Sequence, residues 1–270
     1  MNIKCFYINL DRSIDRRAAI ENDFNRIKPN FEVKRFAAVD GGKEERLNEF
    51  LSAGQTGCYL SHMRLIEAEL KSQQHLMIVE DDESFNFKLE KIDELISDLP
   101  SEDWDIIYLD FTVVEIEDVL YLTRYLYNHK NEIENSKIIS LPKWFTPYGT
   151  HAYVINCRFK EKLYKILNAS KDLGLPIDNI LCLGLKQKVI RSFATVPFLC
   201  YPGVENSKSQ IVSVEHPLAS TWELFRRGIS VNNDQNLSNL EFICKQVVQN
   251  RLNFHPLSKF EPQSRSAVKS

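Results

Sequence analysis

Three consecutive acids, Glu80, Asp81 and Asp82, end the apolar run at residues 76–79. A short run of large aliphatic residues that stops at charged residues predicts a buried parallel strand, and open α/β sheets bind ligands at the carboxyl ends of such strands. Adjacent carboxylates repel one another, and a hard divalent cation with oxygen ligands relieves that repulsion. The alternative is a solvated acidic turn that only caps the next segment. The tripeptide alone leaves both interpretations open.

A second group of polar residues surrounds the end of the first predicted strand. Asn9, Asp11 and Arg12 lie in the loop after it, and Arg16 follows in the next helical turn. A polar loop that leads into a helix N-terminus is a place where a nucleotide can bind. The loop contains no glycine, which excludes a GxGxxG loop and a P-loop. The alternative is a solvated helix face whose arginines pair with neighbouring acids.

Four more residues lie where chemistry is plausible. Asp40 follows the second predicted strand, directly before two glycines. Ser61 and His62 are expected in the first turn of a helix that begins near residue 56, where the helix dipole favours an anion. Asp178 is expected in the first turn of a later helix. The alternatives are a satisfied, partly buried histidine at 62 and a capping carboxylate at 178.

Alternating strands and helices must position these residues. The pattern predicts strands at 4–10, 31–39, 76–79, 105–110, 136–141, 150–155 and 189–199. It predicts helices after residue 13 and at 43–51, 56–70, 89–96, 159–167, 221–228 and 237–252, with one more after 176. Such alternation favours βαβ units and a mostly parallel sheet.

The stretch 111–135 interrupts the alternation. It is acidic at first and then carries Tyr121, Tyr125 and Tyr127 among leucines. Insertions of this kind form lids or binding loops in many α/β domains, and tyrosine offers an apolar ring face with a polar tip for such binding. The alternative is an ordinary surface helix with an aromatic packing face.

Composition limits the class of protein. The 270 residues are 43% hydrophobic and carry a net charge of −3, so a large core is available and no overall basic field attracts nucleic acid. The six cysteines are scattered without a CxxC pair, which favours free thiols. The first residues enter a strand pattern directly, and no apolar run reaches the ~20 residues that span a bilayer. We therefore expect a cytoplasmic protein without a signal peptide or membrane span.

Six ordered segments resemble glycosyltransferase family 25, the lipopolysaccharide and lipooligosaccharide glycosyltransferases related to collagen galactosyltransferases. They are YINLDRSIDRR at 7–17, FAAVDG at 36–41, GCYLSH at 57–62, IVEDD at 78–82, GTHAYVI at 149–155 and PID at 176–178. The resemblance covers roughly residues 3–205. It implies a GT-A-like fold with a Rossmann-type, mostly parallel sheet in a domain over 1–218, followed by a helical extension and tail over 219–270.

The resemblance also implies an activity. It implies inverting transfer of a hexose, most often galactose from UDP-galactose, to a sugar of a lipooligosaccharide, lipopolysaccharide or other glycan acceptor. Mn²⁺ or Mg²⁺ would be held by Asp82 with the help of Glu80, while Asp81 supports the donor. The family match makes Asp178 the expected base, with His151 and Asp110 as the next candidates. The remaining expected contacts are Asn9, Asp11, Arg12, Arg16, Asp40, Ser61 and His62 for the nucleotide, and Gly149, Thr150 and His151 for the acceptor.

Two features depart from the family pattern. The region at 200–206 has no histidine to complete the metal site, and His216 lies downstream as a substitute. The last twenty residues carry a net charge of only +3, which favours at most weak peripheral contact with the inner face of an anionic inner membrane. Two other functions stay open: a metal-dependent nucleotidyltransferase, and a degenerate sugar- or nucleotide-binding module without activity.

Overall fold

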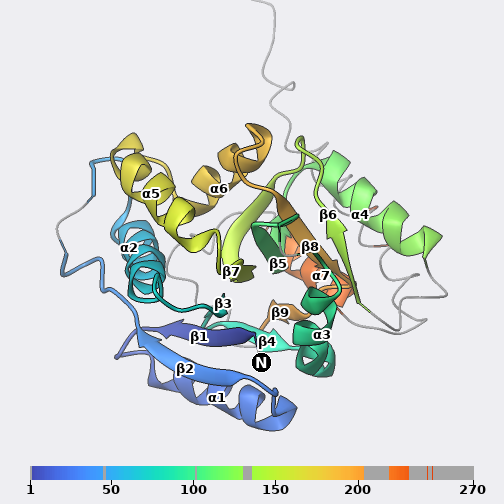
Figure 1. Cartoon of the computed structure of the whole chain (residues 1–270), viewed down its shortest axis with the longest axis horizontal. Helices are drawn as coiled ribbons and strands as arrows, with labels where there is room; N and C mark the ends of the chain where they lie inside the picture. The colour runs from blue at the N-terminus through green and yellow to red at the C-terminus, as the bar shows by residue number, and fades with distance from the viewer. Residues whose placement is uncertain are drawn as a thin grey trace, which may run out of the picture.

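The computed structural model describes residues 2–44, 47–100, 102–129, 136–203 and 219–230, together with Phe242 and Lys245. Within these residues, seven strands form one sheet in the order β2-β1-β3-β7-β5-β8-β6 (Figure 1). The strands are β1 (Ile3–Asn9), β2 (Glu32–Ala37), β3 (His75–Glu80), β5 (Ile106–Val113), β6 (Lys137–Ser140), β7 (Pro147–Ile155) and β8 (Ser192–Val196). Five of these strands run in one direction, and β7 and β6 run in the other. The predicted α/β architecture with a mostly parallel sheet is confirmed.

Both faces of the sheet are covered, which explains the unbroken apolar run before the acids. In β3, Leu76 and Ile78 belong to one hydrophobic cluster, whereas Met77 and Val79 belong to the cluster on the opposite face. Successive side chains of a strand point to opposite faces, so a strand buried on both sides has no polar positions. Glu80 is the last residue of β3 and the first to leave this dry environment.

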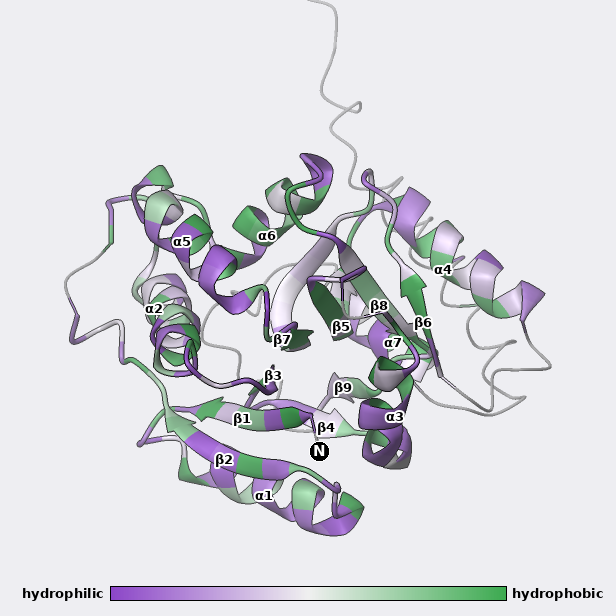
Figure 2. Cartoon of the chain, viewed as in Figure 1, coloured by the Kyte–Doolittle hydropathy of each residue, from purple (hydrophilic) through white to green (hydrophobic). Residues whose placement is uncertain are grey.

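Helices form the outer layers. On one side of the sheet α2 (Ala53–Ala68), α5 (Lys160–Ser170) and α6 (Ile177–Lys186) pack against one another, and on the other lie α1 (Ile14–Ile27) and α3 (Ile92–Ser97) (Figure 1). Hydrophobic and hydrophilic residues alternate around α4 (Ile116–Asn128) in Figure 2, as expected for a helix that buries one face. Short 3-10 turns lie at Phe87–Lys91 and Lys171–Leu173.

Three sequence-based boundaries were wrong. Helix α2 begins at Ala53 rather than near 56, because Ser52 and Gln55 form a capping box; Ser61 and His62 therefore lie in its third turn and not at its N-terminus. The helix predicted at 43–51 is absent among the described residues there, since Asn48 accepts hydrogen bonds from the backbone of residues 50 and 51 instead. The strand predicted at 189–199 is limited to β8.

The stretch 111–135 is largely regular structure. As far as residue 129 it forms the end of β5 and α4, whose Val119, Leu122 and Leu126 are buried in the core. Tyr121 packs edge-on against Trp144 and Phe145. These contacts match the ordinary packing helix that sequence left open as the alternative to a lid; residues 130–135 lie outside the described part.

A second, two-stranded sheet supports the acidic segment. It consists of β4 (Glu83–Phe85), which directly follows Asp82, and β9 (Cys200–Pro202). The Gly203 N–H donates to the Asp82 carbonyl over 2.7 Å, and a Cβ at 203 would lie only 2.9 Å from that oxygen. The close approach therefore requires glycine and fixes the backbone of the acidic turn.

The helix predicted at 221–228 is present as α7 (Ala219–Ser230), and it packs against β5 and β9. Phe242 and Lys245 are helical, in line with the helix expected at 237–252, most of which lies outside the described residues. The boundary expected at 218 stays a prediction.

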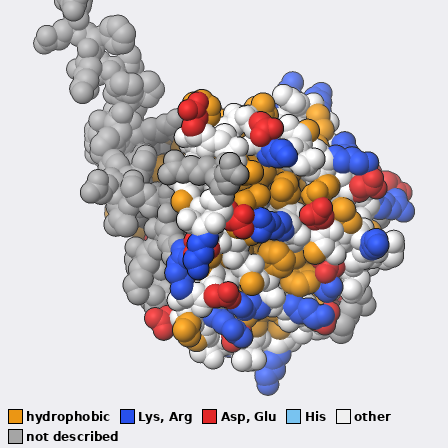
Figure 3. Space-filling model, turned by 90° about the vertical axis from the view of Figure 1, so that its left-hand side faces the viewer, with side chains coloured by type: hydrophobic (Ala, Val, Ile, Leu, Met, Phe, Trp, Pro, Cys, Tyr) orange, Lys and Arg blue, Asp and Glu red, His pale blue; other side chains and the backbone are white. Residues whose placement is uncertain are grey.

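The described helices and one face of the surface bear on membrane and nucleic-acid binding. Among the described helices, none is long and apolar enough to cross a bilayer. On the face shown in Figure 3, basic and acidic side chains are intermixed, with hydrophobic side chains between them. This mixture is consistent with the small net charge of −3.

Candidate active site

A pocket of about 950 Å³ lies at the carboxyl ends of β1, β2 and β3. Strand β7 runs antiparallel to β3, so its first residues reach the same edge of the sheet. The first three turns of α2, the end of β5, the start of α6 and one side of α7 also line the pocket. Twelve of the predicted site residues line this pocket: Arg12, Arg16, Asp40, Ser61, His62, Glu80, Asp81, Asp82, Gly149, Thr150, His151 and Asp178.

Asp82 has a carboxylate oxygen without a partner. Its Oδ1 is buried and accepts no hydrogen bond within the described structure, while Oδ2 lies 3.5 Å from Nη1 of Arg16. Burial, and then the charge of Glu80, raise the pKa of Asp82 from 3.8 to about 7. A cation bound beside Asp82 and Glu80 would favour the charged form of Asp82 and would therefore lower this pKa. Asp82 and Glu80 thus fit a hard divalent cation that takes oxygen ligands.

Asp81 is held by the loop after β1. It accepts hydrogen bonds from Arg16 Nη1 over 2.9 Å and from Asn9 Nδ2 over 2.6 Å. Asn9 is itself fixed by Arg35, which donates to its Oδ1 over 3.0 Å. Asn9 is buried and does not line the pocket, so its role here is to position Asp81.

Two predicted nucleotide contacts pair with arginines. Asp11 does not reach the pocket, contrary to expectation: its side chain is 85% exposed and pairs with Arg35 at 2.5 Å. Asp40 does line the pocket and forms an ion pair with Arg12. The Arg12–Asp40 pair joins the loops after β1 and β2 on the same side of the pocket.

Glu80 is held by β7 and α2. Thr150 Oγ1 donates to Glu80 Oε1 over 2.7 Å, and His62 Nε2 lies 3.5 Å from the same oxygen. Burial acts to raise the pKa of Glu80, but the interactions with His62 and His151 outweigh it and lower the pKa to about 2. Glu80 is therefore the more acidic member and Asp82 the less acidic member of this coupled pair.

The GCYLSH segment joins α2 to the loop after β2. A Cβ at Gly57 would lie 2.6 Å from the Val39 carbonyl oxygen, so only glycine allows this approach. Ser61 Oγ accepts the Val39 N–H over 2.8 Å and donates to the Gly57 carbonyl over 2.6 Å. These contacts explain structurally why a small residue and a hydroxyl lie at this spacing, and they place Asp40 at the pocket wall.

Asp178 combines features of a cap and of a reactive acid. It lies in the first turn of α6 and accepts hydrogen bonds from the N–H groups of Gly149 and Asn179, over 3.0 and 2.9 Å. Burial raises its pKa above 3.8 against the effect of these bonds. The carboxylate is tied to the segment 149–151, so the expected base and the expected acceptor contacts adjoin.

His151 lies in the same wall. Its Nε2 lies 3.1 Å from Thr112 Oγ1, and burial lowers its pKa to about 4, so the ring is neutral near pH 7. A Cβ at Gly149, where φ is +83°, would overlap the ring at 2.3 Å from Nε2. Glycine at 149 therefore leaves the space that the imidazole occupies.

A buried ion cluster forms the floor beneath these residues. Arg226 of α7 donates to Glu83 over 2.7 Å and to both oxygens of Asp110, and all three side chains are at most 3% exposed. Asp110 is thus committed to Arg226 and does not line the pocket, which removes it as an alternative base. His216, the expected substitute metal ligand, lies outside the described residues.

The family model described as glycosyltransferase family 25 (LPS biosynthesis protein) matches residues 2–181. The chain belongs to this family. A glycosyltransferase 25 family member of Anopheles gambiae is 24% identical over 230 residues, which make up 73% of this chain and 36% of that protein. A Drosophila pseudoobscura pseudoobscura member is 31% identical over 127 residues, or 38% of this chain and 20% of that protein. The chain therefore spans little more than a third of the first relative's length.

Two solved structures resemble this family 25 chain at low identity. One is a glycosyltransferase involved in the glycosylation of the major capsid of PBCV-1, with 11% identity and a TM-score of 0.39 over 72% of this chain and 82% of that one. The other is mouse xyloside xylosyltransferase 1 in its apo form, with 10% identity and a TM-score of 0.36 over 70% of each chain.

Several pocket residues were missed by sequence reasoning. Trp222, Glu223 and Arg226 come from α7, which follows the region matched by the family 25 model. No local pattern identifies them, because the contact between Arg226 and Asp110 spans 116 residues of chain. Cys58 was also missed, although its spacing of four residues from His62 puts both on one face of a helix.

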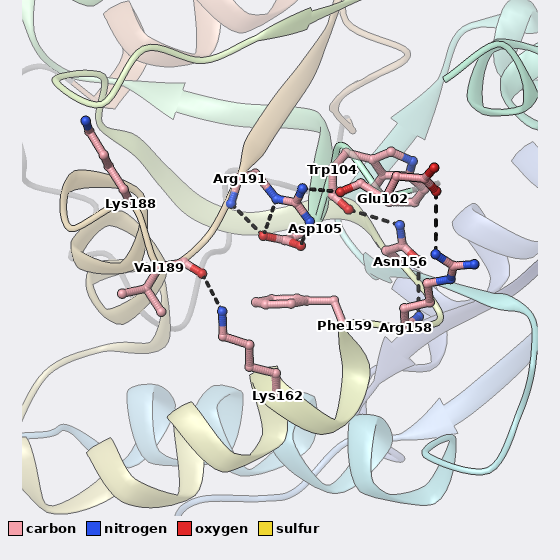
Figure 4. A pocket seen from close by; sticks show the side chains of 10 residues that line it. All are labelled: Glu102, Trp104, Asp105, Asn156, Arg158, Phe159, Lys162, Lys188, Val189 and Arg191. Atoms are coloured by element: carbon pink, nitrogen blue, oxygen red, sulfur yellow. Dashed lines mark hydrogen bonds and ion pairs between the residues drawn. The ribbon is translucent and has the colours of Figure 1, made fainter. Parts of the chain in front are cut away.

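A second pocket, of about 410 Å³, lies at the opposite edge of the sheet (Figure 4). Arg191 donates to both oxygens of Asp105, at 2.8 and 3.2 Å, and Lys162 donates to the Val189 carbonyl over 3.0 Å. None of the residues predicted from the family 25 resemblance lines it.

Proposed function

We propose that this family 25 protein is an inverting, metal-dependent hexosyltransferase. Its donor is UDP-galactose, and its acceptor is a sugar of a lipopolysaccharide, lipooligosaccharide or related glycan. The observation that carries the proposal is the acidic segment at the pocket wall, where Asp82 Oδ1 is buried without a partner beside Glu80. Carboxylates arranged in this way cost stability unless a cation binds them.

The donor would bind between the first two strands and the acids. Arg12, Arg16 and Asp40 line that side of the pocket, and they offer the charged groups and hydrogen bonds that a nucleoside diphosphate requires. Asp81 would contact the donor ribose, held in place by Asn9 and Arg16. When bound by Asp82 and Glu80, Mn²⁺ or Mg²⁺ supplies charge neutralisation for the departing diphosphate.

The acceptor would bind on the β7 side. In inverting transfer an acceptor hydroxyl oxygen bonds to the anomeric carbon while the bond to the UDP oxygen breaks on the opposite face, and the hydroxyl proton must move to a base. Asp178 is our choice of base because it lines the pocket and is hydrogen-bonded to Gly149. Thr150 and His151 would border the acceptor sugar.

Two other functions compete with this proposal. A metal-dependent nucleotidyltransferase would also use acids at the end of a strand, but it normally requires a glycine- and lysine-rich loop after the first strand, and residues 9–13 contain neither residue. A degenerate sugar-binding module would need no cation, whereas the partnerless oxygen of Asp82 favours one.

Incubation of the protein with a panel of UDP-sugars, with and without Mn²⁺, separates the three functions. A transferase hydrolyses its donor slowly without acceptor, and we expect UDP release from UDP-galactose only with the metal present. Asp82→Ala should abolish the release while the protein stays folded. Full UDP release by this variant in EDTA would contradict the proposal. Pyrophosphate release from nucleoside triphosphates would indicate the nucleotidyltransferase, and binding without turnover would indicate the module.

The expected location follows from the substrates. A lipid-linked acceptor and a cytoplasmic nucleotide sugar meet at the inner face of the inner membrane. We therefore propose a cytoplasmic enzyme with at most weak peripheral contact there, and no nucleic-acid partner.

A further inference from the structure

Three side chains of different chemistry converge beside the acidic segment. Cys58 and His62 lie one turn apart on α2, and Glu80 ends β3. One potential ligand atom of each, the cysteine sulfur, an imidazole nitrogen and a carboxylate oxygen, lies within 4.8 Å of the other two. Ligands at 2.0–2.3 Å from a tetrahedral ion are roughly 3.3–3.8 Å apart. The limit of 4.8 Å exceeds this separation, so the side chains must move closer together to bind one ion.

The surrounding residues orient two of these ligands. Tyr153 OH lies 2.8 Å from Nδ1 of His62, and the other ring nitrogen, Nε2, is the one that faces Glu80 at 3.5 Å. Thr150 Oγ1 holds Glu80 Oε1 over 2.7 Å and lies 3.7 Å from Cys58 Sγ. Partners of this kind fix the orientation and tautomer of metal-binding histidines and carboxylates.

The donor set differs from that of Asp82. A thiolate, an imidazole and a carboxylate together favour Zn²⁺ over Mg²⁺ or Mn²⁺, which prefer oxygen ligands. We propose that Cys58, His62 and Glu80 form a three-ligand site for Zn²⁺ or a similar borderline-soft divalent cation. All three residues line the large pocket, so a fourth ligand would come from a molecule in that space.

The new site goes beyond the proposed function and does not depend on it. It shares Glu80 with the oxygen site proposed at Asp82, so Zn²⁺ bound here withdraws a ligand from that site. Zn²⁺ would then oppose activation by Mn²⁺, while Asp82 itself is not needed for Zn²⁺ binding. This difference allows the two sites to be tested separately.

Titration of the full-length protein with Co²⁺ alone tests the proposal, because Co²⁺ replaces Zn²⁺ and a cobalt–thiolate bond absorbs in the near ultraviolet. We expect this near-ultraviolet absorption band in the parent protein and in Asp82→Asn. The band should be absent in Cys58→Ala. Cys182→Ala is the control: Cys182 is a buried cysteine on α6 near the Pro147 carbonyl, and this variant should keep the band. Addition of Zn²⁺ should remove the band from the parent.

Tyr153→Phe provides a second readout that does not alter a ligand. Loss of the hydroxyl that holds His62 should lower the Co²⁺ affinity by about 10–100-fold and leave the band itself in place. The Tyr153→Phe variant also tests the proposal if circular dichroism shows that Cys58→Ala is unfolded. A folded parent without a thiolate band at saturating Co²⁺ would overturn the site, as would a band that survives in folded Cys58→Ala or an unchanged affinity in Tyr153→Phe. Failure of UDP-sugar turnover would not affect any of these results.

Discussion

Two pockets lie at opposite edges of one sheet and differ in how their charges are satisfied. Around Arg191, at the amino ends of β5 and β8, the arginine is paired with Asp105 and part of it reaches solvent (Figure 4). At the carboxyl ends of β1 and β3, Asp81 and Asp82 share Arg16 as a partner, whereas Glu80 lies beside His62, and Asp82 keeps a buried oxygen without a partner. This difference supports our proposal that the larger pocket takes a cation and an anionic ligand, whereas the arginine of the smaller pocket is already paired.

The largest expected effect tests the buried charge beneath the larger pocket. Arg226→Met leaves Glu83 and Asp110 buried without their counter-ion, and removal of one partner of a buried pair typically costs about 3–5 kcal/mol. Urea denaturation should show a loss of that size in the free energy of unfolding. A loss below 1 kcal/mol would mean that the two acids are protonated and need no arginine.

The next effect concerns catalysis on the acceptor side. Asp178→Asn keeps one of the two oxygens that now accept the N–H groups of Gly149 and Asn179, so it can hold one of these groups and the melting temperature should fall only slightly. The variant lacks a basic carboxylate, so kcat should fall by at least ~10²-fold while binding of UDP and Mn²⁺ persists. Parental turnover combined with a melting temperature several degrees lower would make Asp178 a cap and His151 the remaining candidate base.

Asp118 tests whether a partnerless oxygen is by itself a sign of function. Its Oδ1 is also buried and without a partner, yet Asp118 does not line the larger pocket. Burial raises its pKa from 3.8 to about 6, against the hydrogen bond from the Thr146 N–H. The folded state therefore binds more protons than the unfolded state between pH 4 and 6, and stability falls as the pH rises through that window.

Asp118→Asn removes this titration. Relative to the parent, the variant should gain roughly 1 kcal/mol between pH 4 and pH 7, a value reduced for solvent screening. Denaturation at both pH values measures the difference, and Glu117→Gln on the exposed side of the same helix is the control. Transfer activity should be unaffected by Asp118→Asn. A ~10²-fold loss in kcat would instead place α4 in the catalytic machinery.

The smallest effect belongs to the second pocket. The Arg191 side chain is 52% exposed, and exposed ion pairs contribute about 0–1 kcal/mol. Arg191→Met should cost no more than that and leave UDP-sugar turnover intact. A loss of unfolding free energy as large as that of Arg226→Met would contradict the difference between the two pockets.

The arrangement of the acidic strand could be predicted from sequence because its signal is local. The run at 76–79 and the three acids after it place a strand end and a charge cluster within seven residues, and alternation along the first 110 residues predicts the parallel sheet. The boundary errors were local as well: Ser52 and Asn48 direct the backbone through side-chain hydrogen bonds that an apolar pattern does not reveal.

The remainder of the site depends on contacts between distant segments. Asp11 follows a strand as Asp40 does, but Arg35 holds it outside the pocket. Asp110 also ends an apolar run, and only its contact with Arg226 of α7 shows that it is a buried structural acid. The sequence pattern marks Asp11, Asp40 and Asp110 as equally good candidates, because each follows an apolar strand. Which of them faces the pocket depends on its partner in the folded protein, and the pattern does not reveal that partner.

The binding of UDP, measured by isothermal titration calorimetry with Mn²⁺ and again in EDTA, tests most directly whether the acidic segment is a cation site. We expect Mn²⁺ to tighten UDP binding to the parent by at least ~10²-fold, since a metal contributes several kcal/mol at a phosphoryl oxygen. Asp82→Asn should bind UDP weakly under both conditions and remain folded. Equal UDP affinity of the parent with Mn²⁺ and in EDTA would contradict the account.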